Sequence, residues 1–256
     1  VTINGGTITG LTGIEIRSGR LDVSGGTFIS TADEYKAVPN SSGTTVTGAA
    51  IAVSQHTTKK DIKVTITGGT FRGQKAFVET NVQGEPADED ITLTINGGTF
   101  ESAVESADIT NFIKGGQFAK PVAPTLLAGN LNTRLTDADN AVAPYSYYSR
   151  VQDAVNAADE GDTVTVLTNS SEDVTVSKPI KIETEDSVVY TGTVSAGNGY
   201  DVVIGEDGTI TVYKEPEYTG KYSYEIFTTV GDNGAIDVDR YATEGDEVTI
   251  TVSPDE

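Results

Sequence analysis

The sequence contains no cysteine, no methionine and no tryptophan, and its only histidine is His56. The lack of cysteine excludes thiol catalysis, thiolate metal sites and disulfide bonds. His56 lies in the polar stretch SQHTTKKD without serine and aspartate partners in a triad pattern, which is typical of a solvated loop side chain. No apolar run approaches the ~20 residues that cross a bilayer, and no signal peptide is visible, so we expect no membrane insertion.

Positive charge is also scarce. The sequence has 17 lysines and arginines but 38 aspartates and glutamates, which gives a formal net charge of −21. A field of this sign repels phosphate backbones and anionic lipid headgroups, so we expect neither nucleic acid nor a membrane surface as a partner. Cations, basic protein surfaces and neutral glycans remain as partners. The charge also keeps an extracellular protein soluble without any ligand to explain it.

What the sequence has in abundance is a repeat. Near-copies of the opening VTINGGTITG recur as LDVSGGTFIS, VTITGGTFRG, LTINGGTFES and FIKGGQFAK. Their Gly-Gly pairs begin at residues 5, 25, 68, 97 and 115, so the steps are 20, 43, 29 and 18 residues. Polar excursions at 31–47 and 80–90 account for the two long steps. A fixed corner with variable excursions is typical of a solenoid.

The residues before each corner alternate between apolar and polar, as in Leu93, Thr94 and Ile95. This period of two predicts strands with one buried and one solvent-exposed face. One regular corner combined with loops of arbitrary length favours parallel coiling over an antiparallel sandwich. We therefore predict an all-β protein built on a right-handed parallel β-helix (solenoid), with one short capping helix and additional small β modules.

The Gly-Gly pair is interpreted as a sharp corner, because glycine adopts positive φ without strain. Stacking of the repeats in register predicts two columns: Phe28, Phe71, Phe100 and Phe118 with Ile8 at the end, and Thr7, Thr27, Thr70 and Thr99 beside them. Stacked aromatic pairs add about 0.5–1.5 kcal/mol each. The alternative is a threonine array that binds ice, but four interrupted repeats offer too small and irregular a plane.

Four segments are expected: a β-helix at 1–120, a connector at 121–144, a helix-capped second β module at 145–215, and a partial β-repeat or immunoglobulin-like domain at 216–256 that has no closing strand. The KPVAP stretch predicts a break between the two modules. One face of the helix is predicted to hold Val151, Ala154, Val155 and Ala158, with Ser149 and Gln152 as a capping box and Gly161 as the stop. The first repeat begins at residue 1 with no cap before it, so we expect the chain to be part of a longer multidomain protein.

The stretch RVQDAVNAADEGDTVTVLTNSSEDVTVSKPIKIE resembles the entry segment of pectate-lyase-like right-handed β-helices, where a helix caps the coil and a Gly-Asp-Thr-Val turn leads into the first rungs. The GGTF repeats followed by KPVAPTLLAGN resemble modules of large surface proteins of gut Firmicutes. The final NGAIDVDRYATEGDEVTITVSPDE is similar to a bacterial β repeat found beside them. The resemblance implies an extracellular location at a Gram-positive cell surface or cell wall, with which the lack of cysteine agrees.

Two acidic stretches are candidates for calcium: PADEDI with Asp88 and Asp90, and TDADNA with Asp137 and Asp139. The second lacks the downstream glycine and glutamate of a calcium loop. Solvated charge explains both stretches without a ligand, and we favour that interpretation. No other cofactor is expected.

Three tyrosines in PYSYYSR are the candidate binding residues: Tyr145, Tyr147 and Tyr148. Exposed aromatic rings stack on sugars or anchor protein interfaces, whereas buried ones would seal the cap helix onto its coil. Both interpretations stay open from the sequence.

Enzymes of the pectate-lyase-like kind combine carboxylates for calcium with a basic residue in a cleft. Arg72 and Lys75, near Asp61, are the basic candidates, although solvated surface charge explains them as well. The outward residues before the corners are almost all uncharged, which favours a stalk over an enzyme. No catalytic residue is predicted.

We therefore expect a non-enzymatic segment of a secreted or cell-wall-attached bacterial surface protein. It would act as a stalk or adhesin that displays loops to a host or microbial surface protein or glycan. The alternative is a carbohydrate-active or carbohydrate-binding β-helix assisted by calcium. The inference to adhesion depends on family analogy. Any specificity is expected in the two excursions.

Overall fold

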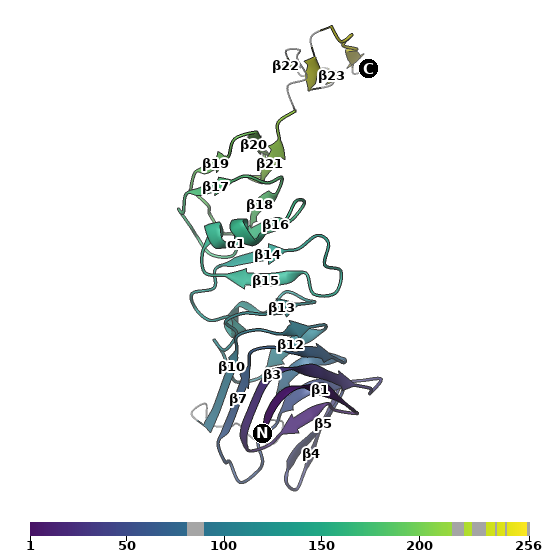
Figure 1. Cartoon of the computed structure of the whole chain (residues 1–256), viewed down its shortest axis with the longest axis vertical. Helices are drawn as coiled ribbons and strands as arrows, with labels where there is room; N and C mark the ends of the chain where they lie inside the picture. Colours follow the sequence, from purple (N-terminus) through teal and green to yellow (C-terminus); the bar gives the residue numbers. More distant parts are fainter. Residues whose placement is uncertain (81–89, 217–222, 227–233, 239, 244, 255–256) are drawn as a thin grey trace.

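The computed structural model describes residues 1–80, 90–216, 223–226, 234–238, 240–243 and 245–254. These residues form an all-β protein with one α-helix, and the strands stack along the long axis of the molecule (Figure 1). None of the described helices is long and apolar enough to span a bilayer. The all-β part of the predicted fold class is confirmed.

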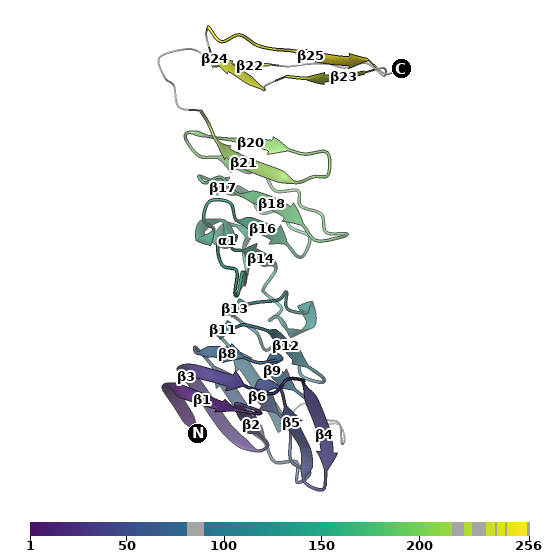
Figure 2. The same ribbon diagram turned by 90° about the vertical axis from the view of Figure 1, so that its right-hand side faces the viewer.

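The corner repeats contribute strands to three faces that surround one core (Figure 2). Two long strands, β1 (Thr2–Gly10) and β3 (Gly19–Ser30), run through their Gly-Gly corners without a break. In later repeats the corner separates two shorter strands: β7 (Ile62–Ile66) from β8 (Thr70–Arg72), and β10 (Ile91–Ile95) from β11 (Thr99–Phe100). β13 (Gln117–Phe118) follows the last corner. The third face is a four-stranded sheet of β2 (Ile14–Ile16), β6 (Ala49–Val53), β9 (Lys75–Glu79) and β12 (Ala103–Ser106). All pairings between these strands are parallel.

Pairing between repeats places equivalent residues directly above one another. Phe28 pairs with Phe71, Phe71 with Phe100, and Phe100 with Phe118. Their rings stack with centroids 5.1, 4.7 and 5.1 Å apart, and Ile8 lies beside Phe28 at the end of the column. The predicted phenylalanine column is confirmed, and the neighbouring threonine column has the predicted register as well.

The alternation before the corners also matches the prediction. In β7 and β10 the apolar residues are buried, while the residues between them are exposed or half-buried. A side-chain period of two therefore separates the core from solvent on this face. A buried carboxylate lies on the third face: Glu79 of β9 is only 1 % exposed, and its Oε2 accepts hydrogen bonds from Ser106 Oγ, Ala107 N and Asp108 N.

The excursion at 31–47 contains an antiparallel hairpin of β4 (Lys36–Asn40) and β5 (Gly43–Thr47). Val46 of the hairpin packs with Ala49, Ala52 and Val78 on the outer side of the third face. The ammonium group of Lys75 lies 4.1 Å from the ring centroid of Tyr35. These contacts fix the inner side of the hairpin and leave Val38 54 % exposed.

The connector continues the sheet and does not interrupt it. It contains the 3-10 helix η2 (Pro124–Leu126) and β14 (Thr133–Thr136). β15 (Tyr145–Tyr148) lies between β13 and β14 and is antiparallel to both. The two modules thus share one sheet, joined between β13 and β15 by the single pair Phe118 and Tyr145, and a break at the prolines stays a prediction.

The second unit extends the same sheet with mixed pairing. β14 is antiparallel to β16 (Thr163–Val166), which is parallel to β18 (Lys181–Thr184). An antiparallel hairpin of β20 (Tyr200–Ile204) and β21 (Ile210–Lys214) follows β18, while β17 (Val174–Val176) and β19 (Val194–Ala196) form a separate parallel pair. A uniformly parallel arrangement thus ends at β13.

Helix α1 (Val151–Ala157) has the predicted apolar face, since Val151, Ala154, Val155 and Ala158 are all buried. The predicted capping box is wrong. The N-cap is Arg150, and no side chain of the helix caps its amide groups. The carboxylate of Glu172 accepts the N–H groups of Val151 and Gln152 at 2.9 and 3.3 Å.

The end of the helix also differs from the prediction. The helix ends at Ala157, with Ala158 as its C-cap, so Gly161 lies beyond the stop. Gly161 has a φ of +90°, which glycine adopts readily. Lys178 donates to the carbonyl oxygen of Asn156 at 3.0 Å and also to that of Ala158.

The final segment contains two antiparallel pairs: β22 (Ser223–Glu225) with β24 (Tyr241–Thr243), and β23 (Gly234–Asp237) with β25 (Thr251–Pro254). The expectation that its last strand has no partner is therefore wrong. Ile250 and Val252 are 54 and 64 % exposed. The hydroxyl groups of Tyr213 and Tyr241 lie 2.9 Å apart and connect the segment to β21.

Candidate functional site

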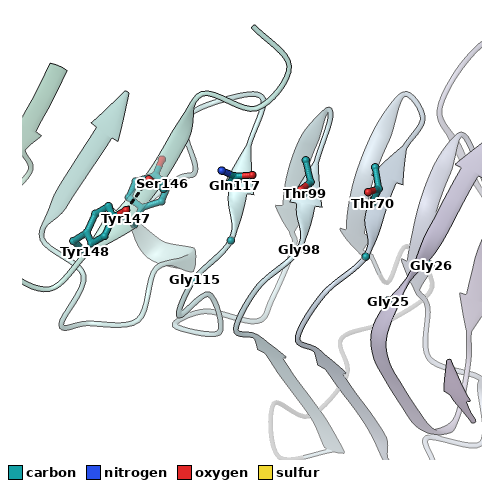
Figure 3. A pocket seen from close by; sticks show the side chains of 12 residues that line it. Gly25, Gly26, Thr70, Gly98, Thr99, Gly115, Gln117, Ser146, Tyr147 and Tyr148 are labelled. Carbon is teal, nitrogen blue, oxygen red and sulfur yellow. Dashed lines mark hydrogen bonds between the residues drawn. The ribbon is translucent and has the colours of Figure 1, made fainter. Parts of the chain in front are cut away.

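A shallow groove of about 690 Å³ runs across the stacked corners. Figure 3 shows side chains of successive repeats side by side along it. The groove is lined by glycines of four corners, by Thr70, Thr99 and Gln117, and at one end by Ser146, Tyr147 and Tyr148. The Gly-Gly-Thr motif and two of the predicted tyrosines therefore meet in one place.

The first glycine of each pair allows the repeats to approach closely. A Cβ atom on Gly68 would lie 2.5 Å from the carbonyl oxygen of Ser24, and one on Gly97 would lie 2.7 Å from that of Thr67. Both distances are shorter than any real Cβ contact, so only glycine fits unless the backbone shifts.

The second glycine of each pair makes the corner itself. Gly69, Gly98 and Gly116 have φ values of +108°, +110° and +127°, which side-chain-bearing residues rarely adopt. Together the two glycines leave the floor of the groove without side chains. The predicted corner role is confirmed, and the floor of the groove follows from it.

The three predicted tyrosines differ in exposure. Tyr147 is buried, its ring makes an edge contact with Phe118 at 5.9 Å, and its hydroxyl oxygen accepts the N–H of Val122 at 2.6 Å. Burial raises the pKa of the Tyr147 hydroxyl. Tyr147 therefore continues the phenylalanine column into the connector, whereas Tyr148 packs against the core cluster that contains α1.

Tyr148 is half-buried, and its hydroxyl lies 3.5 Å from Ser146 Oγ at the end of the groove. Tyr145 is also half-buried but does not line the groove; its ring lies 5.7 Å from the guanidinium of Arg134. Tyr148 is thus the predicted tyrosine best placed to contact a ligand there.

The calcium candidates lie on separate elements. Asp137 Oδ1 accepts the N–H groups of Asp139 and Asn140 at 3.0 Å each, so this carboxylate holds its own loop, and Asp139 is exposed. Asp90 precedes β10, and Asp88 lies outside the described residues. The described part of the chain holds no group of three or more acidic, histidine or cysteine side chains that fits a metal ion. Calcium at these aspartates stays a prediction.

The basic candidates are paired with carboxylates of the following repeat. Arg72 Nε donates to Glu101 Oε2 at 2.6 Å, and Lys75 Nζ donates to Glu105. His56 Nδ1 accepts the N–H of Thr58 at 3.1 Å within its own loop. These side chains lie outside the groove.

Three carboxylates with clear structural roles were missed from the sequence. They are Glu79, the helix-capping Glu172, and Asp162, which accepts the N–H groups of Ala138 and Asp159 at 2.8 Å each. Asp162 is 3 % exposed, and it anchors the loop that contains Asp137. Most of the groups they bind lie about one repeat away in sequence, so no local motif indicates them.

The described residues thus define an all-β protein with a groove across its glycine corners. No protein-family model, curated protein or solved structure matches the chain.

Proposed function

We propose that the chain is a non-enzymatic segment of a secreted or cell-wall-attached bacterial surface protein, in which a right-handed parallel β-helix of the pectate-lyase-like kind acts as a stalk that displays loops. One observation carries the proposal. The phenylalanine column continues through Tyr147 into the connector, so successive repeats and the second unit share one stack of strands. A continuous stack with repeated contacts is suited to hold a displayed loop at a distance.

The outward face supports the stalk over an enzyme. Outward positions on β7 and β10 are mostly threonine, and the groove is lined by glycine, threonine, glutamine, serine and tyrosine. A lyase would instead need several carboxylates and a basic residue facing its substrate. The hairpin β4–β5 provides a loop for display, with Val38 exposed on its outer side.

The proposal is tested by incubating the chain with polygalacturonate and calcium and by screening it against host mucin, host immunoglobulin and glycans. We expect no unsaturated product, and we expect binding that Val38→Asp on the hairpin weakens. Val189→Asp, at an equally exposed valine of the second unit, serves as the matched control. Sustained turnover of the polysaccharide would overturn the stalk proposal in favour of a lyase.

A second candidate function is carbohydrate binding in the groove. Hydroxyl and amide groups of Thr70, Thr99 and Gln117 follow one another on adjacent strands, which lie about 4.8 Å apart, and an aromatic ring lies at the end. Alternating polar groups and an aromatic surface are suited to the hydroxyls and the apolar faces of sugar rings.

If this candidate is correct, Tyr148→Ala should weaken binding of a glycan found on an array by about tenfold, since a lost aromatic contact of this size costs about 1.4 kcal/mol. Thr99→Val, which removes one groove hydroxyl, should cost about two- to tenfold. Tyr224→Ala changes an exposed tyrosine outside the groove and should leave affinity unchanged. Isothermal titration calorimetry provides the affinities, and equal losses in the Tyr148 and Tyr224 variants would place the glycan elsewhere.

A further inference from the structure

A cavity of about 460 Å³ lies in the second unit, between the loop that follows β18 and the tip of the hairpin β20–β21. The buried core residues Ile182 and Ile210 form part of its lining. Val189 and Ile204 line it too, although they are 57 and 68 % exposed. The two large apolar side chains that are most exposed between residues 121 and 216 therefore lie at one cavity.

Beside this cavity, β18 has a partner strand on one side only. Its pairing with β21 ends at Ile182, opposite Ile210, whereas its pairing with β16 continues to Thr184. The N–H groups of Lys181 and Glu185 donate to carbonyl oxygens at the two ends of β16, so residues at odd positions direct their main-chain groups to that side. Thr184 directs its N–H and C=O to the opposite side, where no described strand pairs with it. An extended segment can add to the sheet at this point.

The rim of the cavity is acidic. Between residues 181 and 210 the chain has six carboxylates and a single lysine, Lys181, which forms an ion pair of 2.9 Å with one of them. Asp207 lines the cavity, and Asp186 and Glu206 are exposed on the two segments that enclose it. None of these three carboxylates forms an ion pair with a described lysine or arginine. The cavity thus combines an apolar lining with unpaired negative charge, unlike the groove, which is lined by uncharged residues.

We propose that this cavity binds a short extended segment of a separate protein, in which apolar side chains are flanked by lysine or arginine. The apolar side chains enter the cavity between Val189 and Ile204, and the basic side chains pair with the carboxylates at the rim. Main-chain groups of the segment pair with Thr184. An acidic segment would be repelled by the rim, and a small ligand would leave this main-chain edge unused. The site rests on neither the stalk role nor the groove.

The test uses the fluorescein-labelled peptide GKFKLRG, titrated with the whole chain by fluorescence anisotropy. We expect saturable one-to-one binding that weakens at high salt, because salt screens the exposed charges at the rim. The peptide GEFELEG keeps the apolar residues but reverses the charge, so it should not bind. The peptide GKGKGRG keeps the charge but lacks the apolar residues, and it should bind at least about tenfold more weakly.

Two pairs of variants locate the site, and both members of a pair change the net charge by the same amount. Ile204→Lys should weaken binding of GKFKLRG at least about tenfold, whereas Val142→Lys, at a valine 53 % exposed outside the cavity, should leave the affinity unchanged. Glu206→Lys should weaken binding about three- to tenfold, whereas Glu160→Lys, at an exposed glutamate outside the cavity, should not. Circular dichroism confirms that each variant is folded.

Absence of GKFKLRG binding to the unaltered chain would overturn the proposal, and so would equal affinities within either pair of variants. Equal binding of GKGKGRG and GKFKLRG would also overturn it, because the apolar cavity would then contribute nothing. Isothermal titration calorimetry with octylammonium chloride provides the remaining arm. Binding of this amphiphile without binding of the peptide would assign the cavity to a small cationic ligand and would overturn the proposal as well.

Discussion

Phe71→Ala is expected to lower the free energy of unfolding by about 3–5 kcal/mol. Phe71 is fully buried and stacks between Phe28 and Phe100, at centroid distances of 5.1 and 4.7 Å. The substitution removes a fully buried aromatic ring and leaves a cavity. It also breaks two ring contacts of about 0.5–1.5 kcal/mol each. Because the strands on both sides are hydrogen-bonded in register, the neighbouring rings have little freedom to move into the cavity.

The measurement is urea unfolding followed by circular dichroism and tyrosine fluorescence, with the slope compared between variants. Phe71→Leu keeps most of the volume and should cost less than the alanine variant, while Val189→Ala, at a valine 57 % exposed, should stay within about 0.5 kcal/mol. A loss below about 1 kcal/mol for Phe71→Ala would show that the column does not stabilise the stack.

Gly97→Ala is expected to destabilise the chain by about 1–3 kcal/mol or more, although it adds a single methyl group. The new Cβ would lie 2.7 Å from the carbonyl oxygen of Thr67. The atom in its way belongs to the backbone of the neighbouring repeat, so relief requires two strands to move apart. Gly97 is not among the positive-φ glycines, so the cost is steric and not conformational.

The chain supplies its own matched control for this prediction. Gly5 occupies the equivalent position in the first corner, but its Cβ would meet nothing within 4 Å. Gly5→Ala should therefore change the free energy of unfolding by no more than about 0.5 kcal/mol, or stabilise slightly by restricting the unfolded chain. Thermal and urea unfolding of the two variants side by side provide the comparison. Equal stabilities would mean that inter-repeat approach does not explain the first glycine of the pair.

The corners and the phenylalanine column could be predicted because neighbouring residues within each repeat determine both. Alternation of apolar and polar residues fixes which side is buried, and the Gly-Gly pair fixes where the chain turns, so register between repeats follows without further information. The threonine column is a consequence of the same register. This reasoning fails after Phe118, where β15 pairs antiparallel to β13 and no repeat indicates the direction.

The features that the sequence did not reveal depend on contacts between distant residues. Glu172, not the predicted Ser149, caps α1, and it lies 21 residues after Val151 in the sequence. A motif of neighbouring residues cannot indicate a contact over that separation. Two of the three tyrosines named from the sequence line the candidate groove, but only the strand geometry distinguishes the buried Tyr147 from the half-buried Tyr148. The hairpin at 36–47 was predicted only as a polar excursion.

The junction between β13 and β15 has a mechanical consequence. Because the strands stack along the long axis, a pulling force along this axis crosses every strand interface in series, and each interface bears the whole load. Interfaces between corner repeats are parallel ladders of several residues on more than one face, whereas β13 and β15 share the single pair Phe118 and Tyr145. Within the 13-stranded sheet, this junction is therefore the weakest under tension, and the edge contact of Tyr147 with Phe118 and its hydrogen bond with Val122 reinforce the point where extension of the sheet would begin.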